Sequence, residues 1–251
     1  MKSKILSTIW NNFTEALFPS GIACIICNTD LKHENKYSIC DKCLKALPYN
    51  NGKVCLKCGE QIESLADYCL NCKSDQQRYF TVARAPLLYD GEVKALIHGL
   101  KYNHKKYIGE YMGEFLVDEY IKNNFKADII VPIPLNKNRF KQREYNQAEV
   151  ICHALTEKLN LSLNLDNFIR TIDTPTQTEL SKQERKQNLS SVFKVLDKSV
   201  FKDKIILLVD DVYTTGATME EASHTLLDAG AKSVIALSVA HTLPSYKRNK
   251  K

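Results

Sequence analysis

Eight of the nine cysteines fall into four Cys-x-x-Cys pairs in the first third of the chain. Two residues between the cysteines of a pair let one tight turn aim both thiols at the same point. Two such turns complete the four-thiolate shell that structural Zn²⁺ prefers, so the spacing predicts two structural zinc sites. The simplest assignment is sequential: Cys24, Cys27, Cys40 and Cys43 in the first site, and Cys55, Cys58, Cys69 and Cys72 in the second. An interleaved arrangement stays open, because spacing does not decide which turns share an ion.

Disulfides and iron–sulfur ligation are the rival interpretations of these pairs. A reducing cytosol disfavours disulfides, and the usual iron–sulfur spacings differ from these. The segment has few large apolar residues, so metal binding would supply free energy of folding that so small a core cannot. Its lysines either contact nucleic acid or are solvated on a metal-stapled scaffold, and both interpretations stay open. The ninth cysteine, Cys152, lies at helical spacing among apolar residues and is expected in the core.

A second chemical pattern lies near the carboxyl end, where Asp210 and Asp211 follow the apolar run 205–209. A loop rich in threonine and glycine comes next, and then a helical stretch. The amides of such a loop and of the helix start can bind a phosphate, and Gly216 permits close approach. Paired carboxylates would repel a bare anion, but they can hold hydroxyl groups. The pattern therefore predicts a sugar phosphate ligand, with further hydroxyl donors from Thr214, Thr215 and Thr218.

The elements that must position these residues alternate from about residue 80 onward. Strands are expected over 85–89, 128–134, 204–210 and 233–240, and helices over 92–100, 107–123, 147–159 and 218–229. Apolar runs without alternation are typical of parallel strands covered on both faces. We therefore expect an α/β fold with a doubly wound parallel sheet. In such sheets ligands bind at the carboxyl ends of the strands, which is where the two aspartates fall.

Composition and the chain ends add weaker constraints. The net charge of +6 and the isoelectric point of about 8.7 suit an anionic partner without specifying one. Residues 1–19 have the pattern of an amphipathic helix, which we expect to dock on the protein rather than to anchor it to a membrane. The sequence contains no run of 18 apolar residues, which a membrane-spanning helix would require, so we expect a cytoplasmic protein. The predicted domains are the helix over 1–19, a double zinc ribbon over 20–76, the α/β domain over 80–244 and a basic tail over 245–251.

Several motifs carry a resemblance to known families. Val209 to Thr218 resembles the phosphoribosyl diphosphate (PRPP) signature of type I phosphoribosyltransferases. The segments 131–135 and 139–147 resemble blocks of the ComF family, which is itself similar to the amidophosphoribosyltransferases. Three further parts of the chain match the ComF pattern: Leu17-Phe18-Pro19, the double zinc ribbon and Leu100-Lys101-Tyr102. A fourth matching segment contains Arg170, Thr174, Gln177, Leu180, Arg185, Asn188 and Phe193. The resemblance thus covers nearly the whole chain.

The resemblance implies a role for each matching residue. Asp210 and Asp211 would hold the ribose hydroxyls, and Tyr213, Thr214, Thr215, Gly216, Ala217 and Thr218 would cradle the 5-phosphate. Arg139 and Arg143 would donate to the diphosphate, with Mg²⁺ bound alongside it. The segment 170–193 would close over the site. One position departs from the family pattern, because Glu144 stands where that pattern has glycine.

Two functions follow as expectations from the resemblance. One is an enzyme that transfers the phosphoribosyl group of PRPP to an acceptor, with Asp210, Asp211, Arg139 and Arg143 as the catalytic residues. The other is an accessory protein of DNA uptake that binds single-stranded DNA or senses PRPP. In both cases the resemblance implies a helicase-like ATPase of the competence system as a partner.

Overall fold

The computed structural model describes residues 22–33, 35–73, 78–103, 105–171 and 192–243. The chain forms two compact units, Met1–Leu47 and Pro48–Lys251. The expected helix over 1–19, the basic tail and most of the expected closing segment lie outside the described residues. The predicted domain boundaries therefore stay a prediction.

The described part of the first unit is organised around its cysteines. A bridge pairs Ala23 with Asp30, and helix α2 (Asp41–Ala46) begins directly after Cys40. The side chain of Asn35 accepts hydrogen bonds from the backbone of two residues that follow it, which fixes the turn before the helix. Of the described residues in this unit, only Cys24, Ser38, Ile39 and Leu47 are buried. Such a unit has almost no apolar core of its own.

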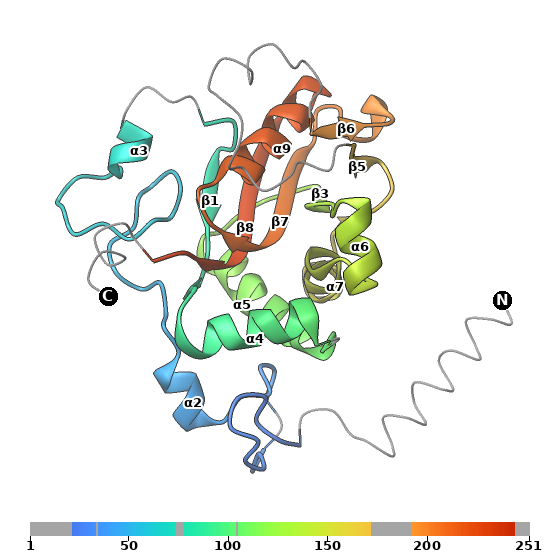
Figure 1. Cartoon of the computed structure of the whole chain (residues 1–251). Coiled ribbons are helices and arrows are strands. Elements are labelled where there is room, and N and C mark those ends of the chain that lie inside the picture. Colours follow the sequence, from blue (N-terminus) through green and yellow to red (C-terminus); the bar gives the residue numbers. More distant parts are fainter. Residues whose placement is uncertain (1–21, 34, 74–77, 104, 172–191, 244–251) are drawn as a thin grey trace, which may run out of the picture. The chain divides into compact units, whose positions relative to one another are not determined.

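The second unit contains a parallel sheet with the strand order β1-β8-β7-β3-β4 (Figure 1). The short strand β2 extends the same side by pairing with the end of β8. The long central strand β7 pairs in parallel with β3 on one side and with β8 on the other. The strands are β1 (Val82–Arg84), β2 (Leu87–Leu88), β3 (Ile129–Pro132), β4 (Ser162–Leu163), β7 (Ile205–Tyr213) and β8 (Ser233–His241).

Helices and two smaller elements complete this unit. The helices are α3 (Leu70–Lys73), α4 (Gly91–Tyr102), α5 (Tyr107–Lys122), α6 (Lys137–Arg143), α7 (Gln147–Leu159) and α9 (Ala217–Asp228). An antiparallel pair joins β5 (Phe168–Arg170) to β6 (Phe193–Val195), and a 3-10 turn, η1 (Lys198–Val200), precedes β7. Among the described residues, no helix is both long and apolar enough to cross a membrane.

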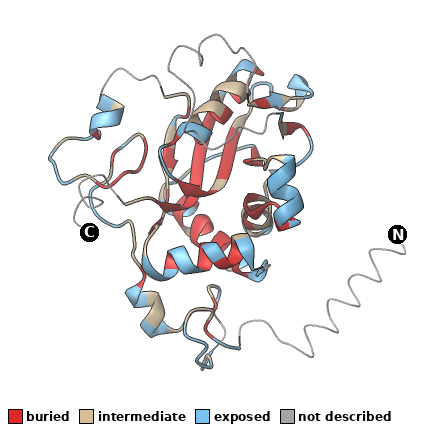
Figure 2. Ribbon diagram, viewed as in Figure 1, coloured by how far each residue is buried: buried red, intermediate tan, exposed pale blue. Residues whose placement is uncertain are grey.

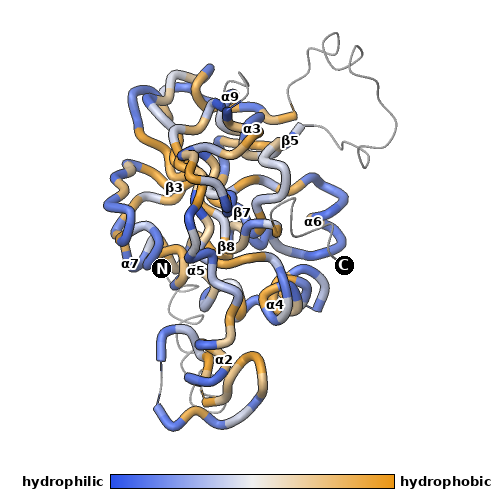
Figure 3. The backbone as a smooth tube through the Cα atoms, turned by 90° about the vertical axis from the view of Figure 1, so that its left-hand side faces the viewer, coloured by the Kyte–Doolittle hydropathy of each residue, from blue (hydrophilic) through white to orange (hydrophobic). Residues whose placement is uncertain are grey.

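The sheet is buried on both faces, as Figure 2 shows for β7 and β8. Alternate residues of a strand point to opposite faces. Ile206 and Leu208 of β7 join a cluster with Met219, Ala222 and Leu226 of α9. Helices α5 and α7 pack together and against β8 and β7, respectively. In Figure 3 the tube is orange along β3 and blue along α6, which carries mostly exposed polar residues.

The α/β arrangement confirms the predicted fold class, and most expected strands and helices are present with small shifts at their ends. The strand expected over 85–89 is limited to the two residues of β2, and the short strands β1, β4, β5 and β6 were not expected. Two differences matter for the site. Strand β7 continues through the aspartates to Tyr213, because Val212 and Tyr213 still pair with β8. Helix α6 was not expected, since its sequence Lys-Asn-Arg-Phe-Lys-Gln-Arg has no apolar stripe. Cys152 is fully buried, which confirms the prediction made for it.

Candidate functional site

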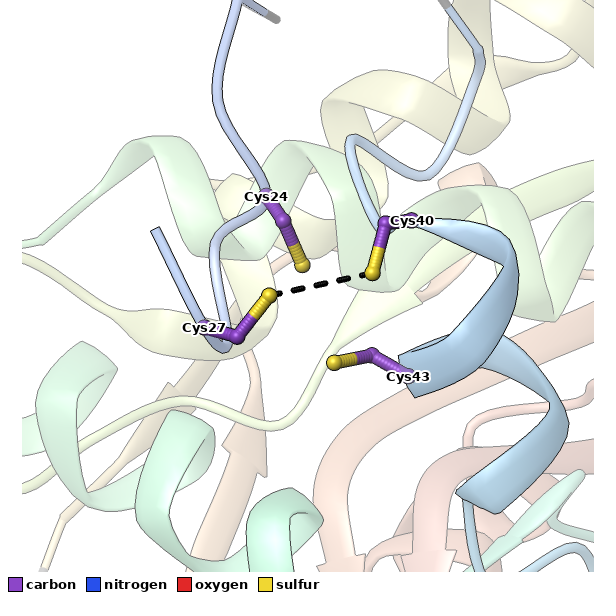
Figure 4. A group of neighbouring side chains, drawn as sticks. All are labelled: Cys24, Cys27, Cys40 and Cys43. Carbon is purple, nitrogen blue, oxygen red and sulfur yellow. Dashed lines mark hydrogen bonds between the residues drawn. The ribbon is translucent and has the colours of Figure 1, made fainter. Parts of the chain in front are cut away.

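The eight paired cysteines form two groups of four in the sequential arrangement. Within each group, the sulfur atoms all lie within 4.8 Å of one another. The Sγ atoms of Cys27 and Cys40 are 3.7 Å apart (Figure 4), and those of Cys58 and Cys69 are 3.6 Å apart. A tetrahedral Zn²⁺ with bonds of about 2.3 Å holds its sulfur ligands about 3.8 Å apart. Both clusters therefore fit structural zinc.

The two clusters differ in their surroundings. Cys27 of the first cluster is exposed, and Cys40 and Cys43 are half-buried. Cys55, Cys58 and Cys69 of the second cluster are buried, and they belong to the apolar core that β7 shares with α9. The second cluster is thus built into the α/β unit.

The two aspartates lie at the carboxyl end of β7. Asp211 is buried, and Nζ of Lys101 lies 2.9 Å from one of its carboxylate oxygens. The Asp210 carboxylate accepts a hydrogen bond of 2.8 Å from the backbone amide of Asp211. Lys101 comes from the last turn of α4, so this helix supplies the cation for the acid pair. The sequence offered Lys101 only as part of the Leu-Lys-Tyr motif and assigned it no role.

The acid pair is electrostatically strained. Burial, and then the nearby charge of Asp211, raise the pKa of Asp210 to about 7, against the opposing effects of Lys101 and Arg170. An aspartate that is half-protonated near neutral pH can donate or accept hydrogen bonds. Both roles suit the hydroxyl groups of a sugar.

The loop after β7 has the backbone that a phosphate site requires. Gly216 caps α9 with φ of 82°, a left-handed conformation that favours glycine. A Cβ at this position would lie 2.1 Å from the hydroxyl oxygen of Tyr213, so no other residue fits there without displacing that ring. Thr214 and Thr215 are exposed. The first amides of a helix have no partner within the helix and can bind an anion, and the first of them in α9, that of Ala217, donates to Oγ1 of Thr215 at 3.4 Å.

A pocket lies against this loop. Its wall includes Thr214, Thr215, Tyr213, His241, Arg78 and Cys58. The Tyr213 ring is stacked on His241 with a centroid distance of 4.7 Å, and its buried hydroxyl has no hydrogen-bond partner among the described residues. The pocket is therefore lined both by the loop and by a residue of the second cysteine cluster.

The two candidate arginines lie one turn apart on α6 but in different environments. Arg143 is buried, donates a 2.8 Å hydrogen bond to the Gln147 side chain and lies over the Tyr102 ring. Arg139 is exposed. Tyr102 directly follows Lys101, so the end of α4 contacts both the acid pair and Arg143. The structure thus connects Arg143 to the acids through α4, and it leaves Arg139 open to solvent.

Glu144 ends α6 in the left-handed conformation, with φ of 64°. Its side chain is exposed. Glycine adopts this conformation without steric cost, whereas other residues pay about 1 kcal/mol. The departure from the family pattern therefore falls at a helix end where glycine would be favoured for its backbone.

Comparisons with known proteins divide the chain in the same way as the motifs. A family model described as a double zinc ribbon domain matches residues 13–73, and one described as a phosphoribosyl transferase domain matches residues 146–251. Competence protein F of Haemophilus influenzae is 30% identical over 221 residues, which cover 84% of this chain and 93% of that protein. DNA utilization protein YhgH of Escherichia coli is 29% identical over 88% of this chain and 90% of that protein. Competence protein ComFC of Streptococcus pneumoniae is 27% identical over 80% of this chain and 86% of that protein.

Solved structures give a looser match. Glutamine phosphoribosylpyrophosphate amidotransferase from B. subtilis aligns with a TM-score of 0.38 and 19% identity, over 53% of this chain and 26% of that chain. A purine phosphoribosyltransferase from Pyrococcus horikoshii aligns with a TM-score of 0.33 and 17% identity, over 54% of this chain and 81% of that chain.

The left-handed end of α6 leads to a test of stability. We expect Glu144→Gly to raise the free energy of unfolding by about 0.5–1 kcal/mol, because relief of the backbone strain exceeds the added entropy of the unfolded chain. Urea unfolding followed by circular dichroism measures this change. Asn160→Gly is the matched control, since Asn160 ends α7 with φ of 52° and asparagine already tolerates that conformation. A loss of stability in Glu144→Gly would show that the carboxylate contributes more than the backbone costs.

The raised pKa of Asp210 leads to a test of pH dependence. Between pH 3.8 and about 7 the folded protein holds a proton that the unfolded chain releases, so this group lowers stability as the pH rises. We expect Asp210→Asn to be more stable than the wild type by about 1–2 kcal/mol at pH 8, and the gain to shrink toward pH 4. Urea unfolding at both pH values measures it, with Glu157→Gln on the exposed face of α7 as control. The same gain at both values would contradict a raised pKa.

Proposed function

Because the chain belongs to the competence protein F family, we propose that its carboxyl-terminal domain binds PRPP and transfers the phosphoribosyl group to a nitrogen nucleophile. The observation that carries this proposal is the order of features along one strand. A buried parallel strand ends in two aspartates, and a left-handed glycine then opens a helix. Family membership also confirms the resemblance drawn from the sequence motifs.

The proposed roles follow the charges of the site. Asp210 and Asp211 hold the two ribose hydroxyls, and Lys101 keeps the acid pair from repelling the incoming anion. The segment from Tyr213 to Thr218 receives the 5-phosphate with its backbone amides and threonine hydroxyls. Mg²⁺ that enters with the diphosphate would neutralise part of its charge.

In the proposed reaction the nucleophile forms a bond to the anomeric carbon of the ribose. The bond from that carbon to the diphosphate oxygen breaks, and pyrophosphate leaves with the electron pair. Positive charge on the sugar develops beside Asp210 and Asp211, while Arg139 and Arg143 stabilise the departing diphosphate. This chain thus contributes positioning and charge stabilisation.

We propose that this activity serves the handling of DNA and takes place in the cytoplasm. The names of the relatives support this setting, since two are called competence proteins and one is called a DNA utilization protein. A helicase-like ATPase of the uptake machinery is the partner that we propose from the family resemblance.

Calorimetric titration of PRPP and Mg²⁺ into the zinc-loaded full chain tests the proposal. We expect saturable binding to the wild type, and binding at least about 100-fold weaker in the Asp210→Asn/Asp211→Asn variant, which loses two charge-assisted hydrogen bonds. Release of pyrophosphate in the presence of candidate nitrogen nucleophiles then tests for transfer.

Glu157→Gln, on the exposed face of α7, is the control and should bind like the wild type. Absence of binding to the wild type, or equal binding to the double asparagine variant, would exclude the proposed site.

A second candidate function is the binding of single-stranded DNA. The observation that favours it is a basic and aromatic surface around α6 and the end of α4, two elements joined by the contact of Arg143 with Tyr102. Phe140 and Tyr102 are 48% and 58% exposed, enough for bases to stack on them. The exposed basic residues of this surface are Lys105, Lys106, Lys137, Arg139 and Lys141. Such a surface combines stacking platforms with charge for phosphates.

Salt titration of oligothymidylate binding tests this second function. We expect affinity to fall steeply with salt, and the variant Lys137→Gln/Arg139→Gln/Lys141→Gln to reduce the slope of log K against log salt by about 2. The matched control is Lys198→Gln/Lys202→Gln/Lys232→Gln, three exposed lysines that precede β7 or β8. An equal loss of slope in both triple variants would place the DNA elsewhere.

A further inference from the structure

We propose that the second cysteine cluster and the phosphate loop are one thermodynamic unit, so that zinc at this cluster and a 5-phosphate at the loop strengthen each other's binding. One set of contacts fixes the cluster to the sheet, and two further sets join it to the loop. This inference rests on the phosphate-binding role proposed above.

The first set of contacts fixes the cluster to the edge of the sheet. The carbonyl of Lys57, between Cys55 and Cys58, accepts a 2.7 Å hydrogen bond from the amide of Ala83 in β1. The Arg84 guanidinium donates to the carbonyls of Cys55 and Leu56 at 3.4 and 3.1 Å. A Cβ on Gly59 would lie 2.8 Å from the Ala83 carbonyl oxygen, so the turn lies directly on the strand. Movement of this turn would disturb β1.

The second set of contacts runs from the end of the ribbon to α9. Arg78 lines the same pocket as Cys58 of the cluster, and its guanidinium lies 3.6 Å from the Glu220 carboxylate. Glu220 also accepts a 2.8 Å hydrogen bond from the amide of Tyr79. Glu220 stands in the first turn of α9, and its own amide donates to the Gly216 carbonyl. The cluster is therefore linked through Arg78 and Glu220 to the helix turn that opens the phosphate loop.

The third set of contacts is a series of rings beneath the loop. Phe80 is fully buried and meets the Tyr213 ring edge-on, with a centroid distance of 6.3 Å. Cys58, Phe80 and Tyr213 belong to the same buried cluster. The Tyr213 hydroxyl lies directly under Gly216. Loss of the metal would loosen the packing on which Gly216 rests.

Linkage of this kind is reciprocal. If zinc at the second cluster favours the loop conformation that binds phosphate, a bound phosphate must raise the zinc affinity of that cluster by the same factor. The first cluster belongs to the other compact unit. We therefore expect its zinc affinity to be independent of the phosphate ligand.

The test measures zinc affinity by competition with a chelator, in the full chain, with and without saturating ribose 5-phosphate. This probe carries the 5-phosphate but no diphosphate, so it cannot react. We expect the zinc affinity of the second cluster to rise at least about fivefold and that of the first to stay constant. Ribose, which lacks the phosphate, should change neither. In Cys24→Ser/Cys27→Ser the remaining zinc belongs to the second cluster, and it should still respond to the ligand.

Variants of Glu220 test the route. Glu220→Ala removes both contacts with the ribbon end, so the effect of ribose 5-phosphate on zinc affinity should fall below about twofold. Glu220→Gln can keep the bond from the Tyr79 amide and should restore part of the effect. Asp228→Asn, at the far end of the same helix, should behave like the wild type. A full effect in Glu220→Ala would overturn the route through this residue.

Calorimetry with ribose 5-phosphate separates the two proposals. If the wild type binds the ligand and the zinc affinity of the second cluster does not change, the linkage is overturned and the phosphate site stands. If the wild type binds no ribose 5-phosphate, the proposed phosphate site falls and the linkage falls with it.

Discussion

The rest of the site depends on the pairing of β7 with strands on both sides. Four residues of β7 pair with β3, and the pairing with β8 continues to Tyr213. Because both faces are also covered, the strand must be apolar until it reaches the edge of the sheet. The first acids that it carries, Asp210 and Asp211, therefore meet a desolvated environment. Their charge is tolerated there because Lys101 is close and because Asp210 can keep its proton.

This constraint explains why α4 matters to a site formed mainly by β7 and its loop. The last turn of α4 brings Lys101 to Asp211 and places Tyr102 against Arg143. One helix end thus balances the negative charge of the acids and holds the buried cation of α6. A ligand that carries both hydroxyl groups and phosphates needs such a division of charge.

The sequence predicted the features that depend on local pattern. The apolar runs identified the central strands, and the repeated Cys-x-x-Cys spacing identified both four-thiol clusters. Contacts between distant segments have no local sequence pattern from which they could be predicted. The ion pair of Lys101 with Asp211 joins residues far apart in the chain, and α6 has no apolar stripe. The sequence showed only that Glu144 stands where the family pattern has glycine. The reason, a left-handed backbone at the end of α6, became apparent only from the φ angle in the structure.

The two cysteine clusters show most clearly that the sequence does not predict contacts between distant segments, because their ligands and spacing are nearly identical in sequence. What separates them is the chain that follows each one. After Cys43 the chain completes the short helix α2, and residues 48–50 then pair with the segment around β2. Cys72 is instead followed within ten residues by Arg78, Tyr79 and Phe80. These three residues contact α9 and the ring beneath Gly216. A cluster gains influence over a distant loop when the residues beside it contact the elements that hold this loop, as Arg78, Tyr79 and Phe80 do after the second cluster.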